Sequence, residues 1–332
     1  MSTRDKSFPP PLSIEPSPIF PRFRKDTLLF CPKCSKCNTR VFLCAFGTVC
    51  FQHSFRNILY KDKLLEIVND QKRNKMEVNI KSDLGERSKF HSTENDPALL
   101  KIVNSANIAC GYHAGDEETM EKTIRISKDN GVSIGSHPSY LDRENFGRKR
   151  MNISPEEVTK LVIDQCEILN KVADKLKMKV THVKPHGALS NMACENYELS
   201  FTIAKAIKQF DPNIIFLAHA QTEMEKAGRD LKLRIACEVF ADRNYEDNGY
   251  LVARSKPNAM ILGREESAKH VLRMLENQAL NCYSGKQIPC DIDSICVHGD
   301  EKTAVDNAQY LREVLIKNGF QLKSLDKLKK IN

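Results

Sequence analysis

Short runs of β-forming residues alternate with helical stretches from residue 76 onward, and this alternation limits the possible folds more than any other feature. The runs expected to form strands are 78–82, 106–110, 132–136, 179–183, 214–218, 234–239 and 294–297. Strand–helix alternation repeated about seven times is typical of a parallel sheet with crossover helices. We therefore predict an α/β fold. A closed or nearly closed (β/α) barrel fits the length, and a doubly wound open sheet is the alternative.

The stretches between the expected strands carry the signals of helix ends. Ser154, Pro155 and Glu157 supply an N-cap, a first-turn proline and a capping-box glutamate ahead of an apolar helical face. An earlier helix is expected to end at Gly131, because glycine is favoured just after a helix. Two further helices are expected over 265–278 and 301–318.

Residues 1–75 differ in composition from the rest of the chain. Six prolines among the first 21 residues prevent regular helix, so we expect a largely disordered extension. Its five cysteines start as C-x2-C-x2-C but lack a second knuckle, so a tail without metal is favoured over a zinc or iron–sulfur site. They are Cys31, Cys34, Cys37, Cys44 and Cys50. The expected segments are the extension (1–75), a barrel domain (76–325) and a C-terminal tail (326–332).

Charge is distributed unevenly along the chain. Residues 1–75 carry 14 Lys and Arg against 6 Asp and Glu, whereas residues 76–332 carry 37 of each. A nucleic-acid-binding body would show a basic surplus, so that class is disfavoured. No run of about 18 apolar residues exists, so no membrane span is expected. With scattered cysteines read as reduced thiols, we expect a cytoplasmic protein, with mitochondrial targeting by the extension as a minor alternative.

Polar side chains follow most of the expected strands. In a parallel barrel the carboxyl ends of all strands open on one face, so these residues should converge there. The candidates for catalysis are Asp83, His113, Asp116, His137, Lys184, His186, Glu238 and Asp242, and those for substrate binding are Arg148, Arg254, His298 and Asp300. His53, His91 and His270 lie outside this pattern and are expected at the surface.

Several of these candidates allow more than one role. Asp83, His113 and His137 could form a two-histidine, one-carboxylate site for a divalent metal, or the histidines could bind substrate and loops without metal. Glu238 with Asp242 could act as acid and base, or could hold Arg243 and Arg254 in place. Arginine side chains at 148 and 254 suit a substrate carboxylate through a bidentate contact.

Long motifs in the same region resemble the LamB/YcsF family. They are SANIACGYHAGD (105–116), IGSHPSY (134–140), FGRKRM (146–151), HVKPHGAL (182–189), EVFADRNYEDNGYLVARSKP (238–257) and ICVHGD (295–300). The resemblance covers about residues 76–325 and leaves residues 1–75 without a counterpart. It implies a barrel, often incomplete with seven strands, that is akin to sugar deacetylases.

The resemblance also implies an activity. Bacterial members are A subunits of ATP-dependent 5-oxoprolinases, so we expect hydrolysis of the lactam 5-oxo-L-proline to L-glutamate. Partner proteins resembling subunits B and C would bind ATP as co-substrate and phosphorylate the lactam. Consistently, the chain contains no G-x-x-x-x-G-K-[ST] phosphate loop. On this reading Lys184 and His186 stabilise the oxyanion or leaving phosphate, and Asp116 orients His113.

The first expected strand departs from the family pattern D-L-N-C-D-L-G-E. Asn79 stands at its first acidic position and Lys81 at its asparagine, while Ser190 replaces a tyrosine further on. These changes leave two alternatives to the hydrolase open. One is a metal-dependent carbohydrate deacetylase, and the other is a binding protein that has lost turnover through Asn79 and Lys81.

Overall fold

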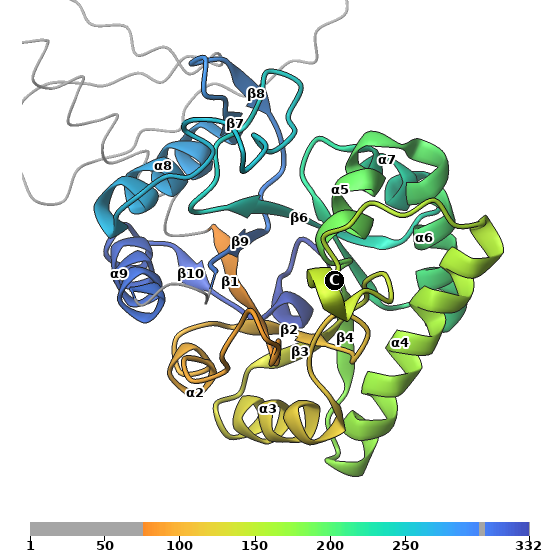
Figure 1. Cartoon of the computed structure of the whole chain (residues 1–332). Coiled ribbons are helices and arrows are strands. Elements are labelled where there is room, and N and C mark those ends of the chain that lie inside the picture. The colour runs from red at the N-terminus through yellow and green to blue at the C-terminus, as the bar shows by residue number, and fades with distance from the viewer. Residues whose placement is uncertain (1–75, 299–302, 332) are drawn as a thin grey trace, which may run out of the picture. The chain divides into compact units, whose positions relative to one another are not determined.

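A closed ring of parallel strands forms the centre of the structure. The computed structural model describes residues 76–298 and 303–331, so the expected extension and Asp300 lie outside the described residues. Within that part, seven strands form the ring (Figure 1). They are β1 (Glu77–Leu84), β2 (Ser105–Ala109), β3 (Ser133–His137), β4 (Val180–Val183), β5 (Ile215–His219), β6 (Arg234–Phe240) and β9 (Ser294–Cys296).

The pairing of β9 closes the ring. Its residue Ser294 is in register with Glu238 of β6 on one side and with Asn79 of β1 on the other, both parallel. The predicted seven-stranded barrel is therefore confirmed, and the open doubly wound alternative is wrong. Each of the seven expected strand runs overlaps one strand of the ring.

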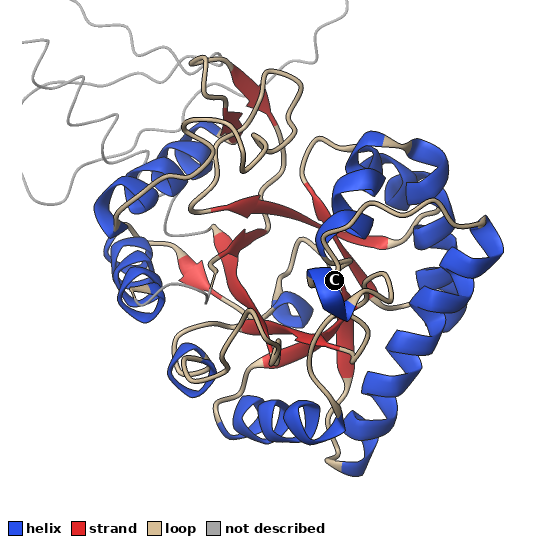
Figure 2. Ribbon diagram, viewed as in Figure 1, coloured by secondary structure: helices blue, strands red, loops and turns tan. Residues whose placement is uncertain are grey.

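Helices surround the ring, as the blue ribbons in Figure 2 show. They are α2 (Asp96–Leu99), α3 (Glu117–Asp129), α4 (Pro155–Lys175), α5 (Gly187–Glu195), α6 (Tyr197–Phe210), α7 (Glu223–Asp230), α8 (Arg264–Asn277) and α9 (Ala304–Lys317). Short elements complete the described chain: the 3-10 helices η1 (Arg143–Asn145) and η2 (Leu325–Lys327), the strand β10 (Gln321–Leu322), and the β7–β8 hairpin (Ala279–Asn281 and Gln287–Pro289). No helix of the described part combines the length and apolarity needed for a membrane span.

The predicted capping box of α4 is present. Ser154 accepts from the Glu157 backbone N–H, and the Glu157 side chain accepts from the Ser154 N–H. The predicted helix over 265–278 also forms, as α8, but one expectation there was wrong. His270 is only 2% exposed, because its side chain lies on the face of α8 that packs inward and its ring stacks on Tyr245 at 6.3 Å.

The strands separate an apolar outer layer from a polar interior. Along β1, Val78 and Ile80 belong to the hydrophobic core shared with the helices. The alternate residues Asn79, Lys81 and Asp83 bond to side chains of other strands across the ring. Because side chains alternate faces along a strand, this period-two pattern gives β1 an apolar face toward the helices and a charged, hydrogen-bonding face inside the ring.

The amino-terminal end of the ring is covered by the end of the described chain. Leu325 and Leu328 are buried against Ile215 and Leu217, which point into that end of the barrel. Asn79 Nδ2 donates to the Lys323 carbonyl at 2.8 Å. The polar interior is thus closed at this end, and its accessible side is the carboxyl end of the strands.

Candidate active site

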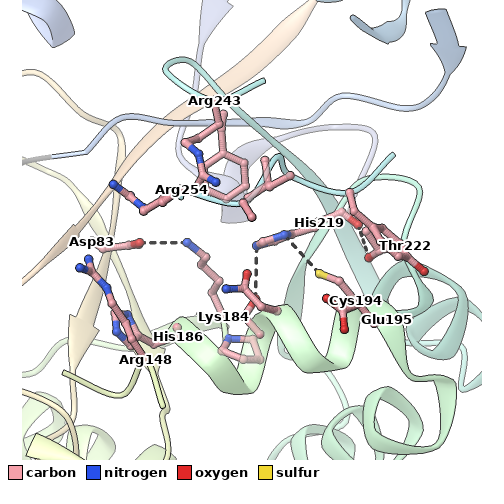
Figure 3. Close-up of a pocket in the computed structure, with 18 of the residues that line it drawn as sticks. Asp83, Arg148, Lys184, His186, Cys194, Glu195, His219, Thr222, Arg243 and Arg254 are labelled. Carbon is pink, nitrogen blue, oxygen red and sulfur yellow. Dashed lines mark hydrogen bonds and ion pairs between the residues drawn. The ribbon is translucent and has the colours of Figure 1, made fainter. Parts of the chain in front are cut away.

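A cavity of about 360 Å³ opens at the carboxyl ends of the strands (Figure 3). This volume lies in the range that small-molecule sites occupy. Its lining brings together seven of the residues predicted from sequence: Asp83, His137, Arg148, Lys184, His186, Arg254 and His298. Glu238 and His113 lie directly behind that lining, in contact with Lys184 and His186 respectively.

Two lysines and two carboxylates form a buried network at the cavity floor. Lys81 Nζ lies 2.9 Å from Asp83 Oδ1 and 2.6 Å from Glu238 Oε1. Lys184 Nζ lies 2.9 Å from Asp83 Oδ2 and 3.4 Å from Glu238 Oε2. Asp83 also accepts from Asn107 Nδ2 at 2.6 Å. Each carboxylate therefore faces both ammonium groups, and the network carries no net charge.

The pKa values of this network follow from its pairing. Burial opposes charge on Lys81, but the Asp83 and Glu238 carboxylates outweigh it and hold the pKa of Lys81 well above its usual range. Burial likewise raises the pKa of Asp83, yet His137 and the two lysines bring it well below its usual range. Against burial, Lys184 and Lys81 also lower the pKa of Glu238. All three groups are charged at neutral pH.

Three histidines and Glu86 form a second cluster beside the first. His113 stacks on His186 with ring centroids 3.9 Å apart, and His137 meets the His186 ring edge-on at 4.8 Å. Glu86 Oε1 lies 3.0 Å from His113 Nε2. Gly85, at φ 71°, turns the chain at the end of β1 and brings the Glu86 side chain back over the ring. One nitrogen or oxygen of each residue lies within 4.8 Å of the others, an arrangement that could hold a metal ion.

Burial keeps the imidazoles of His113 and His186 neutral. It is the main cause that lowers the pKa of His113 well below its usual value, with His137 adding to it. The pKa of His186 is also well below its usual value, through burial and then through His113. Neutral imidazoles present lone pairs, which is the form that binds metals or accepts protons.

Asp116 lies outside the site, which corrects its predicted role. Its carboxylate is the N-cap of α3 and accepts from the Thr119 backbone N–H at 2.9 Å. It also pairs with Arg87, and its side chain is 45% exposed. Sequence placed Asp116 three residues from His113, but the turn between them sends the two side chains apart. Glu86 takes the predicted position beside His113.

The rim of the cavity is cationic. Arg148 lies over the Phe146 ring at 4.9 Å, and Arg254 is exposed. Arg243 is buried and donates to the Val252 carbonyl at 2.7 Å. From the sequence it was considered only as a possible partner of Glu238 and Asp242. Figure 3 shows Arg148 and Arg254 on the side of the cavity where Asp83 lies, and Arg243 above them.

Asp242 supports the rim rather than lining the cavity. Its Oδ2 lies 2.7 Å from Nδ1 of His298, which does line it. Although burial raises the pKa of Asp242, His298 brings it below the usual range. An ionised Asp242 therefore fixes the orientation of His298. Asp300, which was predicted to bind substrate together with His298, is outside the described residues.

Sequence reasoning assigned no role to three members of the site: Glu86, Lys81 and His219. Glu86 follows Asp83 by three residues and carried no separate signal. Lys81 was interpreted only as a departure from the family motif. Because it precedes Asp83 by two residues on one strand, the two side chains lie on the same face, inside the ring. His219 ends β5 and lines the cavity, where its Nδ1 lies 3.3 Å from Cys194 Sγ.

A seven-stranded (β/α) barrel with charged and imidazole side chains gathered at its open end has the architecture of a barrel enzyme. Comparison with known proteins narrows this class. The sequence profile of the LamB/YcsF family matches residues 78–330, and the chain belongs to that family.

The matched relatives are 5-oxoprolinase A subunits. The one from Azoarcus sp. (strain BH72) is 44% identical over 253 residues, which is 76% of this chain and 99% of the relative. The one from Staphylococcus epidermidis (strain RP62A) is 42% identical over 252 residues, 76% of this chain and 100% of the relative. The crystal structure of the lactam utilization protein from Thermus thermophilus matches with a TM-score of 0.70 and 34% identity, over 75% of this chain and 100% of that one. The chain is a homologue of these 5-oxoprolinase A subunits.

Proposed function

We propose that this chain opens the lactam ring of 5-oxo-L-proline to give L-glutamate, as the A-type component of an ATP-dependent 5-oxoprolinase. The observation that carries the proposal is the position of Lys184. This ammonium group is almost fully buried, is fixed by Asp83 and Glu238, and faces a cavity lined by arginines. Together with the family, that arrangement suits a small anionic substrate whose carbonyl oxygen gains negative charge during reaction.

The chemistry divides between this chain and its partners. A lactam is a stable amide, so its carbonyl oxygen is first phosphorylated by ATP on partner proteins of the B and C type. One water then adds to the activated carbon and the C–N bond breaks, with a proton going to the ring nitrogen. A second water releases phosphate and leaves the glutamate carboxylate. This chain supplies the site for ring opening.

The side chains of the cavity have distinct proposed roles. Lys184 stabilises the negative charge that develops on oxygen, because it is a fixed cation in a site of low dielectric. Asp83 is ionised and paired with two lysines, so it holds Lys184 in position and is a poor proton acceptor. The wall formed by Glu86, His137 and His186 positions the attacking water.

The substrate's own carboxylate would be held at the rim. Arg148 and Arg254 present guanidinium groups toward the cavity, and such groups bind carboxylates with two parallel hydrogen bonds. His298 lines the same cavity and is held by Asp242 through Nδ1, so in its neutral form Nε2 accepts a hydrogen bond from substrate. The proposed enzyme acts in the cytoplasm, where thiols such as Cys166 and Cys194 remain reduced.

The test is release of glutamate from 5-oxo-L-proline by the full chain, with ATP and bacterial B and C subunits. Lys184→Met removes the cation without removing bulk and should lower turnover at least 100-fold while circular dichroism stays unchanged. Lys101→Met, at an exposed position outside the cavity, is the matched control and should retain full turnover. A Lys184→Met variant as active as the control would remove Lys184 from the mechanism.

Two further arms separate the alternatives. If the wild type releases no glutamate and the Lys81→Asn variant does, the natural chain is a binding protein in which Lys81 prevents the reaction. Asn79 need not be changed, because it bonds at the opposite end of the barrel from the cavity. Release of acetate from a model N-acetyl sugar without ATP would instead favour the deacetylase. Either result overturns the proposal.

A further inference from the structure

We propose that Glu86, His113, His137 and His186 bind one divalent transition-metal ion of the zinc class at the wall of the cavity. The four residues come from the ends of four consecutive strands, β1 to β4, and the turns after them. Their ligand atoms converge within 4.8 Å, and all four side chains are buried. The inference concerns metal binding itself and does not depend on which substrate the cavity takes.

Hydrogen bonds outside the cluster fix which nitrogen of His137 faces inward. His137 Nδ1 lies 2.7 Å from the carbonyl oxygen of Lys184. A carbonyl oxygen only accepts, so Nδ1 carries the ring proton. In the neutral ring, Nε2 therefore presents a lone pair to the centre of the cluster.

The same reasoning applies to His186. Its Nε2 lies 3.0 Å from the carbonyl oxygen of Phe146, so Nε2 is the donor and Nδ1 holds the lone pair. Yet His186 Nδ1 and His137 Nε2 are only 3.0 Å apart. Two lone pairs thus face each other at a distance where one partner should donate.

Glu86 adds a third acceptor to this centre. Its Oε1 lies 3.2 Å from His186 Nδ1 and 3.8 Å from His137 Nε2. His113 Nε2 can donate to Glu86, which satisfies one of these atoms. A proton on one of the other rings would satisfy one more pair, whereas a cation at the centre would satisfy all the acceptors together. His137 and His186 thus have the outer hydrogen bonds that usually orient imidazoles around bound zinc, whereas Nδ1 of His113 is buried without a hydrogen-bond partner among the described residues.

The second nearby carboxylate is unsuited to the ion. Asp83 Oδ2 lies 3.5 Å from His137 Nε2, but both Asp83 oxygens are taken by lysine ammonium groups. We therefore assign Glu86 and His186 to the ligand set in place of Asp83. Three imidazoles and one carboxylate suit Zn²⁺ and its transition-metal neighbours better than Mg²⁺ or Ca²⁺, which prefer oxygen ligands.

The site would be reachable from the cavity. Glu86, His137 and His186 line it, while His113 lies behind the His186 ring. An ion held by these groups would present one side to a water or a substrate oxygen. A metal ion bound there would lower the pKa of a coordinated water and so would supply a nucleophile at neutral pH.

Metal content measures the proposal directly. The protein is the full, tag-free chain with serine at Cys31, Cys34, Cys37, Cys44 and Cys50, so that thiols of the extension cannot bind the probe. After removal of metal with a chelator, Zn²⁺ is titrated and the retained metal is measured after dialysis. Co²⁺ is used in parallel, because its visible absorption reports the ligand set. The expected result is one equivalent of either metal per chain, without a thiolate charge-transfer band.

Variants test the assignment of ligands. Glu86→Gln and His113→Gln should weaken Zn²⁺ binding more than about 100-fold, since even outer-shell changes cost 10–100-fold. His219→Gln is the matched control, because His219 is a buried histidine of the same cavity outside the cluster, and it should keep one equivalent. Circular dichroism checks that each variant is folded.

The outcomes separate this inference from the proposed function. No stoichiometric metal in the five-serine parent chain, or equal binding by the cluster variants and the His219→Gln control in that chain, would overturn it. A chain that binds one equivalent but releases no glutamate leaves the metal site standing and counts against the 5-oxoprolinase activity. Turnover by metal-free protein in excess chelator would instead support the activity without the metal.

Discussion

At the scale of single residues, the altered first strand separates into a structural change and an electrostatic one. Asn79 lies at the closed end of the barrel, where it donates to Ser105 Oγ and the Lys323 carbonyl and accepts from Ser294. Lys81 lies two residues nearer the cavity and pairs with Asp83 and Glu238. Only Lys81 bears on the chemistry, because it neutralises charge beside Lys184.

Restoring an acid at position 79 should destabilise this chain. In Asn79→Asp, the carboxylate cannot donate, and it faces the Lys323 carbonyl oxygen at the distance of a hydrogen bond. The expected loss is about 1–3 kcal/mol of unfolding free energy, the cost of a buried group left unsatisfied. Urea denaturation measures it. Asn152→Asp, at an exposed position, is the control and should change stability by less than about 0.5 kcal/mol. Equal stability of both variants would contradict the bonding described for Asn79.

Residue roles were harder to predict than residue positions. The candidates His137, Lys184 and His186 were placed at the open end because strand periodicity alone determines the end and face of a barrel residue. The partners of Asp116 and Glu86 depend on single turns, whose geometry leaves little trace in the sequence. A capping aspartate three residues from a histidine therefore looked like its partner, while Glu86 went unassigned.

At the scale of elements, the packing of β3 against β4 depends on one glycine. A Cβ at Gly135 would lie 2.2 Å from the His182 ring, which is in register with it on the next strand. His182 in turn bonds to Asn107 Oδ1 at 2.9 Å, and Asn107 donates to Asp83. The glycine therefore makes room for a chain of contacts that ends at the cavity floor.

Adding that methyl group should be costly only while the ring is present. We expect Gly135→Ala to destabilise the protein by about 1–3 kcal/mol through overpacking. In a His182→Ala background the same substitution should cost less than about 1 kcal/mol, since the clash is gone. A double-mutant cycle by chemical denaturation measures the coupling between the two positions. An equal cost in both backgrounds would show that the clash is relieved elsewhere.

Elements with a periodic pattern were predicted well, and irregular ones were not. The seven ring strands and the capping box of α4 follow from local signals. The β7–β8 hairpin and β10 are two or three residues long and, unlike the similarly short β9, were not expected from the sequence. The inward-facing His270 was missed because one polar residue on a helix does not indicate which face is buried.

At the scale of the whole molecule, buried neutral histidines make stability depend on pH. Burial lowers the pKa of His182 and of His219 to about 3, each against a value near 6.5 in the unfolded chain. Below about pH 6.5 the unfolded state binds protons that the folded state does not, so stability falls with pH. Asp83 and Glu238 have lowered pKa values, so their contribution is constant in this range and is lost only at more acidic pH.

The expected loss between pH 7 and pH 5 is about 2 kcal/mol for each of these two histidines, at about 1.4 kcal/mol per pH unit. Urea denaturation at both pH values, with a chelator present, measures it. His219→Gln should reduce the difference between the two pH values by about 2 kcal/mol, because one titrating group is removed. A pH dependence that is the same in wild type and variant would contradict the burial of a neutral His219.

The closure of the ring also has a consequence for how the chain assembles. Asn79 and Ser294 bond to each other in the finished barrel although they are 215 positions apart in the chain. Strand β1 also pairs with β10, where Val78 is in register with Leu322. The first strand leaves the ribosome early but finds two of its neighbours only when synthesis is nearly complete. Contacts between such distant segments carry a large loop-closure cost and form slowly. Until β9 and β10 have been synthesised, the lysine and carboxylates of β1 remain hydrated. These charges keep the unpaired strand soluble before its late partners form.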